Sequence, residues 1–293
     1  MPTGEALVAA WRARGHHRTV LGERVFVVDV PAVDPGDGPP LVVLHGFPTS
    51  SFDFHRVVDG LAARRRVVLL DYPGFGLSAK PDRPYLLTGQ ADTVVALLAD
   101  LGIDRLGLLT HDIGDTVGGE LLARQLAGTW DVEVSDRVLT NGTVFMDLVQ
   151  LSDGQRLLES LPDERLPDGV LDRDAVLAGV VATFAPDARP DPDELDAQWA
   201  ILSAEGGERL LPRLARYIEE RRRLEARFTP PVTAHPSPLT VVWGTADPIA
   251  VAAMADRLQA QRADARVVRL DGVGHYPMLE APERFLDAVR HGG

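Results

Sequence analysis

The sequence LGLLTHDIGDT at residues 106–116 brings an apolar run, a reactive side chain and a small residue close together. The apolar run predicts a strand, and the helical pattern of residues 117–127 follows after a short turn. A strand, a tight turn and a helix form a nucleophile elbow, which here has Asp112 at its apex. Gly114, two positions later, lets the strand and the helix approach closely. The alternative is that Asp112 merely caps the helix, since aspartate is a preferred N-cap residue.

Two further polar residues follow predicted strands and favour catalysis over capping. Asp247 lies in the loop after the strand at 239–243, and His275 follows the last strand, at 265–270. Taken singly, such an aspartate is usually a turn residue and such a histidine a surface residue. Nucleophile, acid and histidine nevertheless appear in the order expected when Asp112 opens a catalytic triad on an α/β sheet. Each lies at the edge where open α/β sheets bind ligands.

The sequence His-Gly-Phe-Pro at 45–48 directly follows the predicted strand at 41–44. Beside a nucleophile elbow, this loop supplies one backbone N–H group of an oxyanion hole, from Phe47. The residue after the nucleophile, Ile113, supplies the other. Residues 71–78 contain a Gly-x-Gly pattern, but the third glycine, the immediate helix and the acidic residue of a dinucleotide site are missing. We therefore exclude dinucleotide binding.

Short β-branched runs alternate with helical stretches over most of the chain. This pattern predicts an α/β fold, a mostly parallel sheet with helices on both faces. The continuous apolar character of the runs suits strands that are covered on both sides. Residues 19–21 and 25–30 predict an N-terminal hairpin. The remaining predicted strands are 41–44, 67–70, 106–109, 137–140, 239–243 and 265–270.

The pattern changes between residues 143 and 233, where helix-like segments are interrupted by proline and aspartate and no strand is evident. We expect residues 143–233 to form a helical cap inserted into an α/β core made of residues 1–142 and 234–293. Within the cap, residues 213–227 carry many charges at helical spacing. Such spacing predicts a solvated helix face with ion pairs rather than a basic binding site.

Composition excludes several classes of function. The 293 residues include no cysteine, so thiol catalysis, zinc thiolates and disulfides are excluded. The net charge of −13 would repel nucleic-acid phosphates and anionic lipids. No segment approaches the roughly 20 apolar residues of a membrane span, and the apolar stretch at 6–11 is too short for a signal peptide. We expect a soluble, cytoplasmic protein with no nucleic-acid or membrane partner, and a homodimer stays open.

At these motifs the chain resembles the α/β-hydrolase superfamily, and within it the epoxide hydrolases and haloalkane dehalogenases that use an aspartate nucleophile. Several segments look most like the mesoderm-specific transcript branch, namely 45–51, 74–76, 111–115, 194–199, 217–221 and 275–277. The resemblance spans roughly residues 41–289. It implies an α/β-hydrolase fold, a cap and the triad Asp112, Asp247 and His275, but that branch implies no substrate.

A carboxylate nucleophile indicates which kind of bond is attacked. Attack on an ordinary ester would give an anhydride, whereas attack on an sp³ carbon that bears a leaving group gives a stable alkyl ester. We therefore expect the partner to be a small apolar molecule with an electrophilic carbon, hydrolysed without a cofactor. His275, oriented by Asp247, would activate the water that hydrolyses the ester on Asp112.

The residues around Asp112 favour epoxide hydrolysis. The dehalogenases of this group hold the halide with N–H donors, chiefly a tryptophan directly after the nucleophile. Here Ile113 occupies that position, and Phe47 stands where one subfamily has asparagine, so neither side chain is a donor. Epoxide hydrolases protonate the alkoxide with cap tyrosines, usually two, and Tyr217 is the only tyrosine of this cap. Trp199 is a second substrate-binding candidate. Haloalkane, lactone or ester hydrolysis, and a ligand-binding protein with little or no turnover, are the alternatives.

Overall fold

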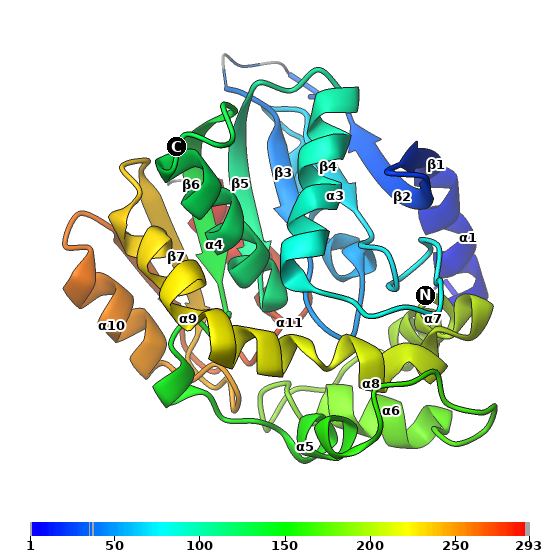
Figure 1. Ribbon diagram of the computed structural model, residues 1–293. Helices are drawn as coiled ribbons and strands as arrows, with labels where there is room; N and C mark the ends of the chain where they lie inside the picture. The colour runs from blue at the N-terminus through cyan, green and yellow to red at the C-terminus, as the bar shows by residue number, and fades with distance from the viewer. Residues whose placement is uncertain (1, 35, 37, 291–293) are drawn as a thin grey trace.

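The computed structural model describes residues 2–290 except 35 and 37, and an eight-stranded sheet forms its centre (Figure 1). The sheet order is β1-β2-β4-β3-β5-β6-β7-β8. β1 and β2 form an antiparallel hairpin, β2 pairs antiparallel with β4, and the strands from β4 to β8 are parallel. The mostly parallel sheet and the predicted hairpin are thus confirmed. The strands are β1 Gly15–Val20, β2 Glu23–Val30, β3 Leu41–Leu44, β4 Val67–Leu70, β5 Arg105–His111, β6 Glu133–Thr140, β7 Leu239–Gly244 and β8 Arg266–Leu270.

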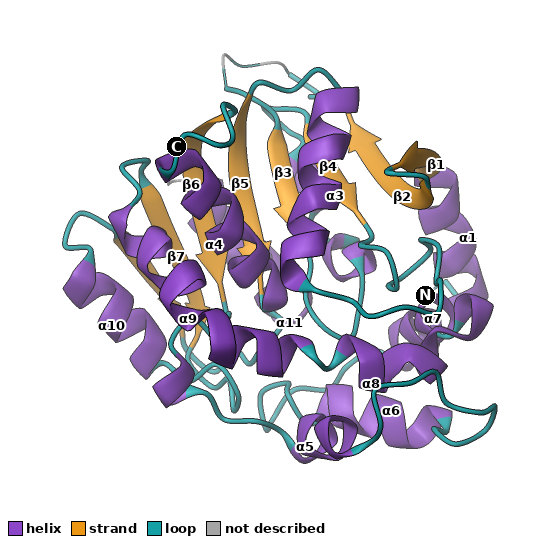
Figure 2. Cartoon of the chain, in the orientation of Figure 1, coloured by secondary structure: helices purple, strands orange, loops and turns teal. Residues whose placement is uncertain are grey.

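Helices cover both faces of the sheet, as Figure 2 shows, and bury alternate side chains of the strands. In β3, Val42 and Leu44 belong to the apolar cluster beneath α3 and α4, whereas Leu41 and Val43 belong to the cluster on the other face. Burial on both sides explains why the strands read as continuous apolar runs. The helices of this layer structure are α2 Val58–Leu61, α3 Leu87–Asp100, α4 Ile113–Leu126, α10 Ala253–Gln261, α11 Pro277–Glu280 and α12 Pro282–Arg290.

The chain between β6 and β7 forms helices and turns, with no strand among residues 141–238, all of which the structure describes. In Figure 1 these helices lie beyond the arrowheads of the parallel strands, over the edge where Asp112, Asp247 and His275 were expected. The helices are α5 Asp153–Ser160, α6 Arg173–Val181, α7 Pro192–Leu202, α8 Leu211–Leu214 and α9 Tyr217–Ala234. The boundaries 143 and 233 of the cap stay a prediction.

Helix α9 joins the cap to the core. Its backbone departs from helical geometry at Leu224, where φ is −113° and ψ is 20°. Beyond that bend the helix packs on α4, and the buried carboxylate of Glu120 accepts hydrogen bonds from Arg227 of α9 and Arg124 of α4. The second half of α9 therefore covers the core, although the sequence places it within the cap.

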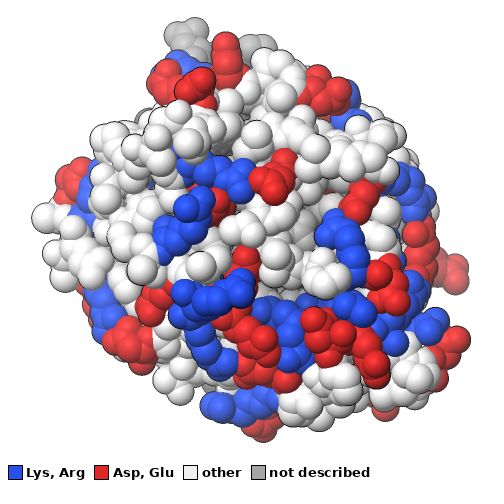
Figure 3. All heavy atoms as spheres, viewed as in Figure 1, with Lys and Arg blue, Asp and Glu red and all other residues white. Residues whose placement is uncertain are grey.

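The charged helix residues of the cap pair with one another and with the core. Arg216 pairs with Glu219, Arg222 with Glu159, and Arg227 with Glu120. In Figure 3 blue and red atoms are intermixed over this part of the surface, and no large area of one sign appears there. The structure therefore confirms ion pairs along this segment, but the face is not solvated throughout, because Glu220 and Arg221 are buried.

The N-terminal helix α1, Gly4–Arg14, was not predicted from the sequence. It packs on α7 of the cap, and the backbone N–H of Gly4 donates to Asp193 over 3.2 Å. On its other side, the ring of Trp11 meets Phe52 edge to face, with centroids 5.8 Å apart. The apolar residues 6–11 thus belong to a helix that packs on α7 and on Phe52. None of the described helices combines the length and the hydropathy needed to cross a bilayer.

Candidate active site

Asp112 lies in the turn between β5 and α4, with a φ of 52° and a ψ of −115°. A positive φ is strained for a residue with a side chain, and such strain is concentrated at functional sites. Asp112 occupies the N-cap position of α4, yet its buried side chain makes no capping hydrogen bond. Instead its Oδ1 accepts a hydrogen bond from the backbone N–H of Phe47 over 2.7 Å. The geometry favours the elbow over the capping alternative.

Gly114 is required by the close approach of α4 to the sheet. A Cβ at this position would lie 2.3 Å from the carbonyl oxygen of Leu44, the last residue of β3. No backbone oxygen tolerates a carbon at that distance, so any larger residue would push α4 away from the strand. The spacing of a glycine two residues after Asp112 thus has the physical reason that the sequence suggested.

His275 and Asp247 form a buried pair at the same edge of the sheet. His275 Nδ1 donates to Asp247 Oδ2 over 2.7 Å. The other oxygen, Oδ1, accepts from the backbone N–H groups of Ile249 and Ala250, at 2.8 and 2.9 Å. These contacts fix the carboxylate, which in turn fixes the orientation and tautomer of the imidazole. The structure therefore brings the predicted acid and histidine together.

Asn141 is a site residue that the sequence reasoning treated only as the end of the core segment. Its Nδ2 donates to Asp247 Oδ2 over 2.8 Å, and its Oδ1 accepts from the backbone N–H of Gly244 over 2.8 Å. The amide thereby fixes the end of β6 against the end of β7. Its position directly after the predicted strand at 137–140 was the signal available in the sequence.

The far nitrogen of His275 faces Asp112. Nε2 lies 3.7 Å from Asp112 Oδ2, beyond hydrogen-bond distance, and has no hydrogen-bond partner among the described residues. Burial alone would lower the pKa of the imidazole, but the carboxylates of Asp247 and Asp112 raise it to about 9. While both carboxylates are charged, His275 is therefore an imidazolium at neutral pH.

The two predicted oxyanion donors lie on either side of the elbow. Phe47 already donates to Asp112 Oδ1, as described above. Ile113 is the first residue of α4, so its N–H group has no carbonyl partner within the helix. The positive end of the helix dipole adds to the attraction for negative charge at this point. The site thus distinguishes the two carboxylate oxygens, since Oδ1 is held by an N–H group and Oδ2 faces His275.

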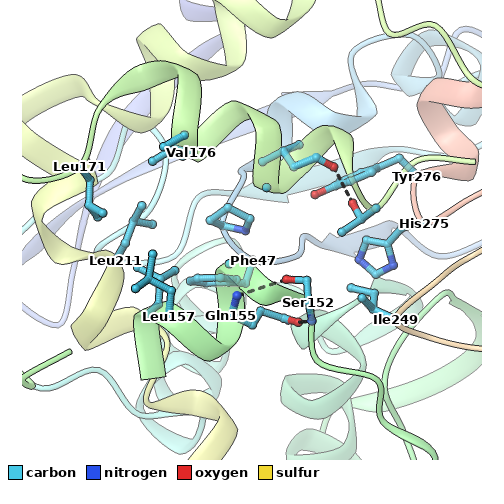
Figure 4. A pocket seen from close by; sticks show the side chains of 17 residues that line it. Phe47, Ser152, Gln155, Leu157, Leu171, Val176, Leu211, Ile249, His275 and Tyr276 are labelled. Atoms are coloured by element: carbon cyan, nitrogen blue, oxygen red, sulfur yellow. Dashed lines mark hydrogen bonds between the residues drawn. The ribbon is translucent and has the colours of Figure 1, made fainter. Parts of the chain in front are cut away.

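A cavity of about 90 Å³ lies between the cap and this edge of the sheet (Figure 4). From the core, Phe47, Ile249 and His275 reach it. From the cap, its lining is mostly apolar, with no charged side chain, and comprises Leu157, Leu158, Leu171, Ala175, Val176, Val180 and Leu211 together with Ser152, Gln155 and Thr183. The composition suits a small uncharged apolar ligand with a few polar contacts.

The Gln155 side chain lines the cavity from the cap and is held by two hydrogen bonds. Its Oε1 accepts from the backbone N–H of Ser152, and its Nε2 donates to the Tyr217 hydroxyl oxygen, each over 2.8 Å. The first contact fixes which end of the amide faces the tyrosine. Sequence reasoning missed Gln155, although Ser152-x-x-Gln155 is a capping-box pattern that could have marked the start of α5.

Tyr217 does not itself line the cavity, but it contacts two residues that do. Besides the bond from Gln155, its ring packs on Phe47 with centroids 5.2 Å apart. Burial, and next the negative charge of Asp112, raise the pKa of the Tyr217 phenol above its ordinary value. Trp199, on α7, is only partly buried against the core cluster and is not among the residues that line the cavity. The structure thus brings Tyr217, but not Trp199, to the predicted site.

Among the described residues, no group of three His, Asp or Glu side chains is arranged to hold a metal ion. The polar groups of the site are instead connected to one another, as the bonds of Asp247, His275 and Gln155 show.

Comparison with known proteins shows what the chain is similar to. Residues 41–288 match the family described as the alpha/beta hydrolase family. A protein of Mycobacterium tuberculosis named putative hydrolase LipZ is 36% identical over 284 residues, which cover 96% of each chain. The mesoderm-specific transcript protein of Mus musculus is 33% identical over 291 residues, covering 95% of this chain and 85% of the relative. Haloalkane dehalogenase 2 of Mycobacterium bovis is 27% identical over 266 residues, covering 88% of both. The resemblance inferred from the motifs is confirmed.

Proposed function

The chain belongs to the α/β-hydrolase family, and from that premise we propose that it hydrolyses epoxides of small apolar molecules through an ester on Asp112. The observation that carries this proposal is the unequal environment of the two Asp112 oxygens. Oδ1 accepts the Phe47 N–H bond, whereas Oδ2 faces His275 across 3.7 Å. Oδ2 is therefore the nucleophilic atom, and Oδ1 is the atom on which charge develops later.

In the first step, Asp112 Oδ2 attacks an epoxide carbon, the carbon–oxygen bond of the ring breaks, and the released alkoxide takes up a proton. A carboxylate gives a stable alkyl ester with such a carbon. The apolar lining of the cavity orients a substrate of matching polarity against His275, whose Nε2 faces Asp112.

The Gln155–Tyr217 pair is the proposed donor to the alkoxide. Because the Tyr217 oxygen accepts the Gln155 bond, its own O–H is free to point elsewhere. The amide of Gln155 has a second N–H, since only one is used by Tyr217. An alkoxide is a much stronger base than a phenolate, so a phenol with a raised pKa still acts as its acid. In this proposal the amide takes the role that a second cap tyrosine has in epoxide hydrolases.

In the second step, His275 becomes the base. Esterification removes the charge of Asp112, which is one of the charges that raise the pKa of His275. The pKa therefore falls, a larger fraction of the imidazole is neutral, and Nε2 of that neutral form can take a proton from water. That water attacks Cγ of Asp112, the charge develops on Oδ1, and the N–H groups of Phe47 and Ile113 stabilise it. Cleavage of the Cγ–Oδ2 bond then releases the diol, whose departing oxygen takes the proton of the new hydroxyl on Cγ. Asp112 returns to its carboxylate, and His275 keeps the proton that it took from water.

Proton balance supports epoxides over haloalkanes. An epoxide takes up one proton when it opens, here from the Tyr217 phenol. His275 releases a proton to solvent after Asp112 is esterified, and the phenolate takes one from solvent, so the two changes compensate. A halide leaves without a proton and needs N–H donors instead, which the side chains of Ile113 and Phe47 lack. Similarity to the protein named haloalkane dehalogenase 2 makes dehalogenation the second candidate function. In that reaction the Gln155 amide would donate a hydrogen bond to the leaving halide.

A panel of matched substrates tests the proposal. Terminal epoxides, chloro- and bromoalkanes, and methyl esters of the same carbon skeletons are compared by kcat/KM under one set of conditions. We expect diol from epoxides at the highest kcat/KM. Halide release exceeding diol formation would replace the proposal by dehalogenation, and carboxylic acid from the esters as the main product would point to ester hydrolysis.

Replacing Gln155 by leucine should weaken the proton donor without removing the nucleophile. We expect kcat/KM for an epoxide to fall by roughly 10- to 100-fold, and Tyr217→Phe to reduce it by roughly 10²- to 10³-fold. The two changes together should cost less than the product of the separate losses, because the residues share one hydrogen bond. Steady-state kinetics of the three variants measure this, and fully multiplicative losses would mean that the two side chains act independently.

A further inference from the structure

Glu280 binds the loop that carries His275. Both oxygens of its carboxylate accept hydrogen bonds from backbone N–H groups, Oε2 from Gly274 over 2.9 Å and Oε1 from Tyr276 over 3.0 Å. These two residues directly precede and follow His275. Glu280 is the last residue of the short helix α11, so the carboxylate lies within one helical turn of the loop. The chain on both sides of the histidine is thereby held.

The same carboxylate also binds the cap. Glu280 Oε2 accepts a further hydrogen bond from the backbone N–H of Ala185 over 2.9 Å. Two residues earlier, the carbonyl oxygen of Thr183 accepts the backbone N–H of His275 over 3.0 Å. Thr183 also lines the cavity. One side chain of the core and one backbone bond thus connect a wall of the cavity to the histidine.

Close packing makes this connection obligatory. A Cβ on Gly274 would lie 2.2 Å from the backbone nitrogen of Ala185, so only glycine allows the cap segment 183–185 to lie against the histidine loop. On the opposite side, His111 Nε2 donates to the carbonyl oxygen of His275 over 2.8 Å. The backbone of His275 is therefore fixed between the cap and β5.

We propose that Glu280 is a positioning residue that couples the cap segment 183–185 to His275, so that the histidine is aligned with Asp112 only when this cavity wall is docked. The inference rests on the proposed function, because it assigns Glu280 to the alignment of the proposed base. It extends that function by making the base depend on the cap, which forms most of the cavity. Binding of substrate against the cavity wall then stabilises the aligned base.

A carboxylate suits this role better than an amide. Three N–H donors converge on Glu280, and both oxygens accept, whereas a glutamine would direct its own N–H₂ group at one or two of them. Glu280 is also one of the titratable groups around His275, which include Tyr276, Asp53 and Asp115. Asp247 and Asp112 flank the imidazole, His111 packs on it with ring centroids 4.8 Å apart, and the charge of Glu280 adds to the carboxylates that raise the pKa of His275.

The test compares Glu280→Gln with the wild-type protein in three measurements. The pKa of the His275 imidazole is measured by NMR without substrate, exchange of the Ala185 amide proton reports on the cap contact, and steady-state kinetics with an epoxide give kcat and KM. We expect a lower His275 pKa, faster exchange at Ala185, and kcat reduced by roughly 10- to 100-fold with KM changed by less than about threefold.

Glu220→Gln is the matched control. Glu220 is also a buried carboxylate that binds core backbone from the cap, since it accepts from the N–H groups of Leu87 and Thr88, but it has no contact with the histidine loop. This variant should leave the His275 pKa and Ala185 exchange unchanged. Equal changes in both variants would overturn the proposal, because they would reflect general loosening of the cap.

Further outcomes separate this proposal from the proposed function. If the wild-type protein does not hydrolyse epoxides, the proposed function fails, while the NMR and exchange measurements still decide whether Glu280 couples the cap to His275. If neither the His275 pKa nor the exchange of the Ala185 amide proton changes in Glu280→Gln, the coupling is overturned, whatever substrate the protein hydrolyses. Glu280→Asp keeps the charge but shortens its reach, so it replaces Glu280→Gln if that variant does not fold. Glu280→Asp should speed exchange of the Ala185 amide proton. An exchange rate equal to that of the wild-type protein would also overturn the coupling.

Discussion

Asp112→Ala is expected to lower kcat/KM at least about 10⁴-fold while the protein still folds. The loss is large because removal of a covalent nucleophile eliminates the ester pathway, and only binding and the oxyanion donors remain. Folding should survive because the Asp112 side chain does not cap α4. The change leaves the N–H of Phe47 without its acceptor, which costs about 1–3 kcal/mol. Steady-state kinetics and a thermal melt of the same sample measure the two effects.

Asp112→Asn is the control for shape. The amide oxygen can still accept the Phe47 hydrogen bond, so the fold around the elbow is retained, but an amide is a poor nucleophile. We expect stability close to that of the wild type and kinetics close to those of Asp112→Ala. Activity within tenfold of the wild type in either freshly purified variant would move the nucleophile to another residue.

His275→Gln is expected to stop the reaction after its first half. Asp112 can still attack the substrate, but no base remains to activate water, so the alkyl ester should accumulate. Steady-state turnover should fall at least about 10⁴-fold, with a burst of one equivalent of opened substrate. Intact-protein mass spectrometry should show the mass of one epoxide added to the chain, and peptide mapping should locate it on Asp112.

The double variant Asp112→Ala, His275→Gln controls for other alkylated side chains. It should acquire no added mass under the same conditions. If His275→Gln shows no adduct with an epoxide that the wild-type protein turns over, direct attack of water on the epoxide becomes the better account. In that case Asp112 would act as a general base rather than as the nucleophile.

The positions of Asp112, Asp247 and His275 could be predicted because each lies in the turn or loop that follows a strand. An apolar run of four to six residues fixes where a parallel strand ends, and all parallel strands end at one edge of the sheet. Three side chains placed by that rule lie at the same edge of the sheet. The same rule applied to residues 45–48 located Phe47, whose N–H indeed reaches Asp112.

The contacts that complete the site could not be predicted in this way. Gln155 meets Tyr217 across 62 positions of the chain, and Glu280 meets Ala185 across 95. Such pairs depend on how the cap is oriented on the core, which hydrophobic periodicity does not encode. Helix α1 was missed for a related reason. Its apolar residues pack on the core and on α7, and these contacts are not visible in the sequence pattern.

The cap tyrosines illustrate the difference between what the sequence predicts and what the structure adds. From the sequence, one tyrosine in place of two weakens the case for an epoxide. The structure places the Gln155 amide on the Tyr217 hydroxyl and at the cavity. In the proposed function this amide is the second donor, of another residue type. A residue count cannot detect this substitution, because it depends on which side chains converge.

The most direct test of the account is a single turnover in ¹⁸O-labelled water, with the enzyme in excess over an epoxide. Hydrolysis through an ester on Asp112 predicts that the diol receives an unlabelled oxygen from Oδ2 and that one ¹⁸O atom appears in the Asp112 carboxylate. Labelled diol with unlabelled protein would contradict the covalent mechanism, because the oxygen would then have passed directly from water to the substrate.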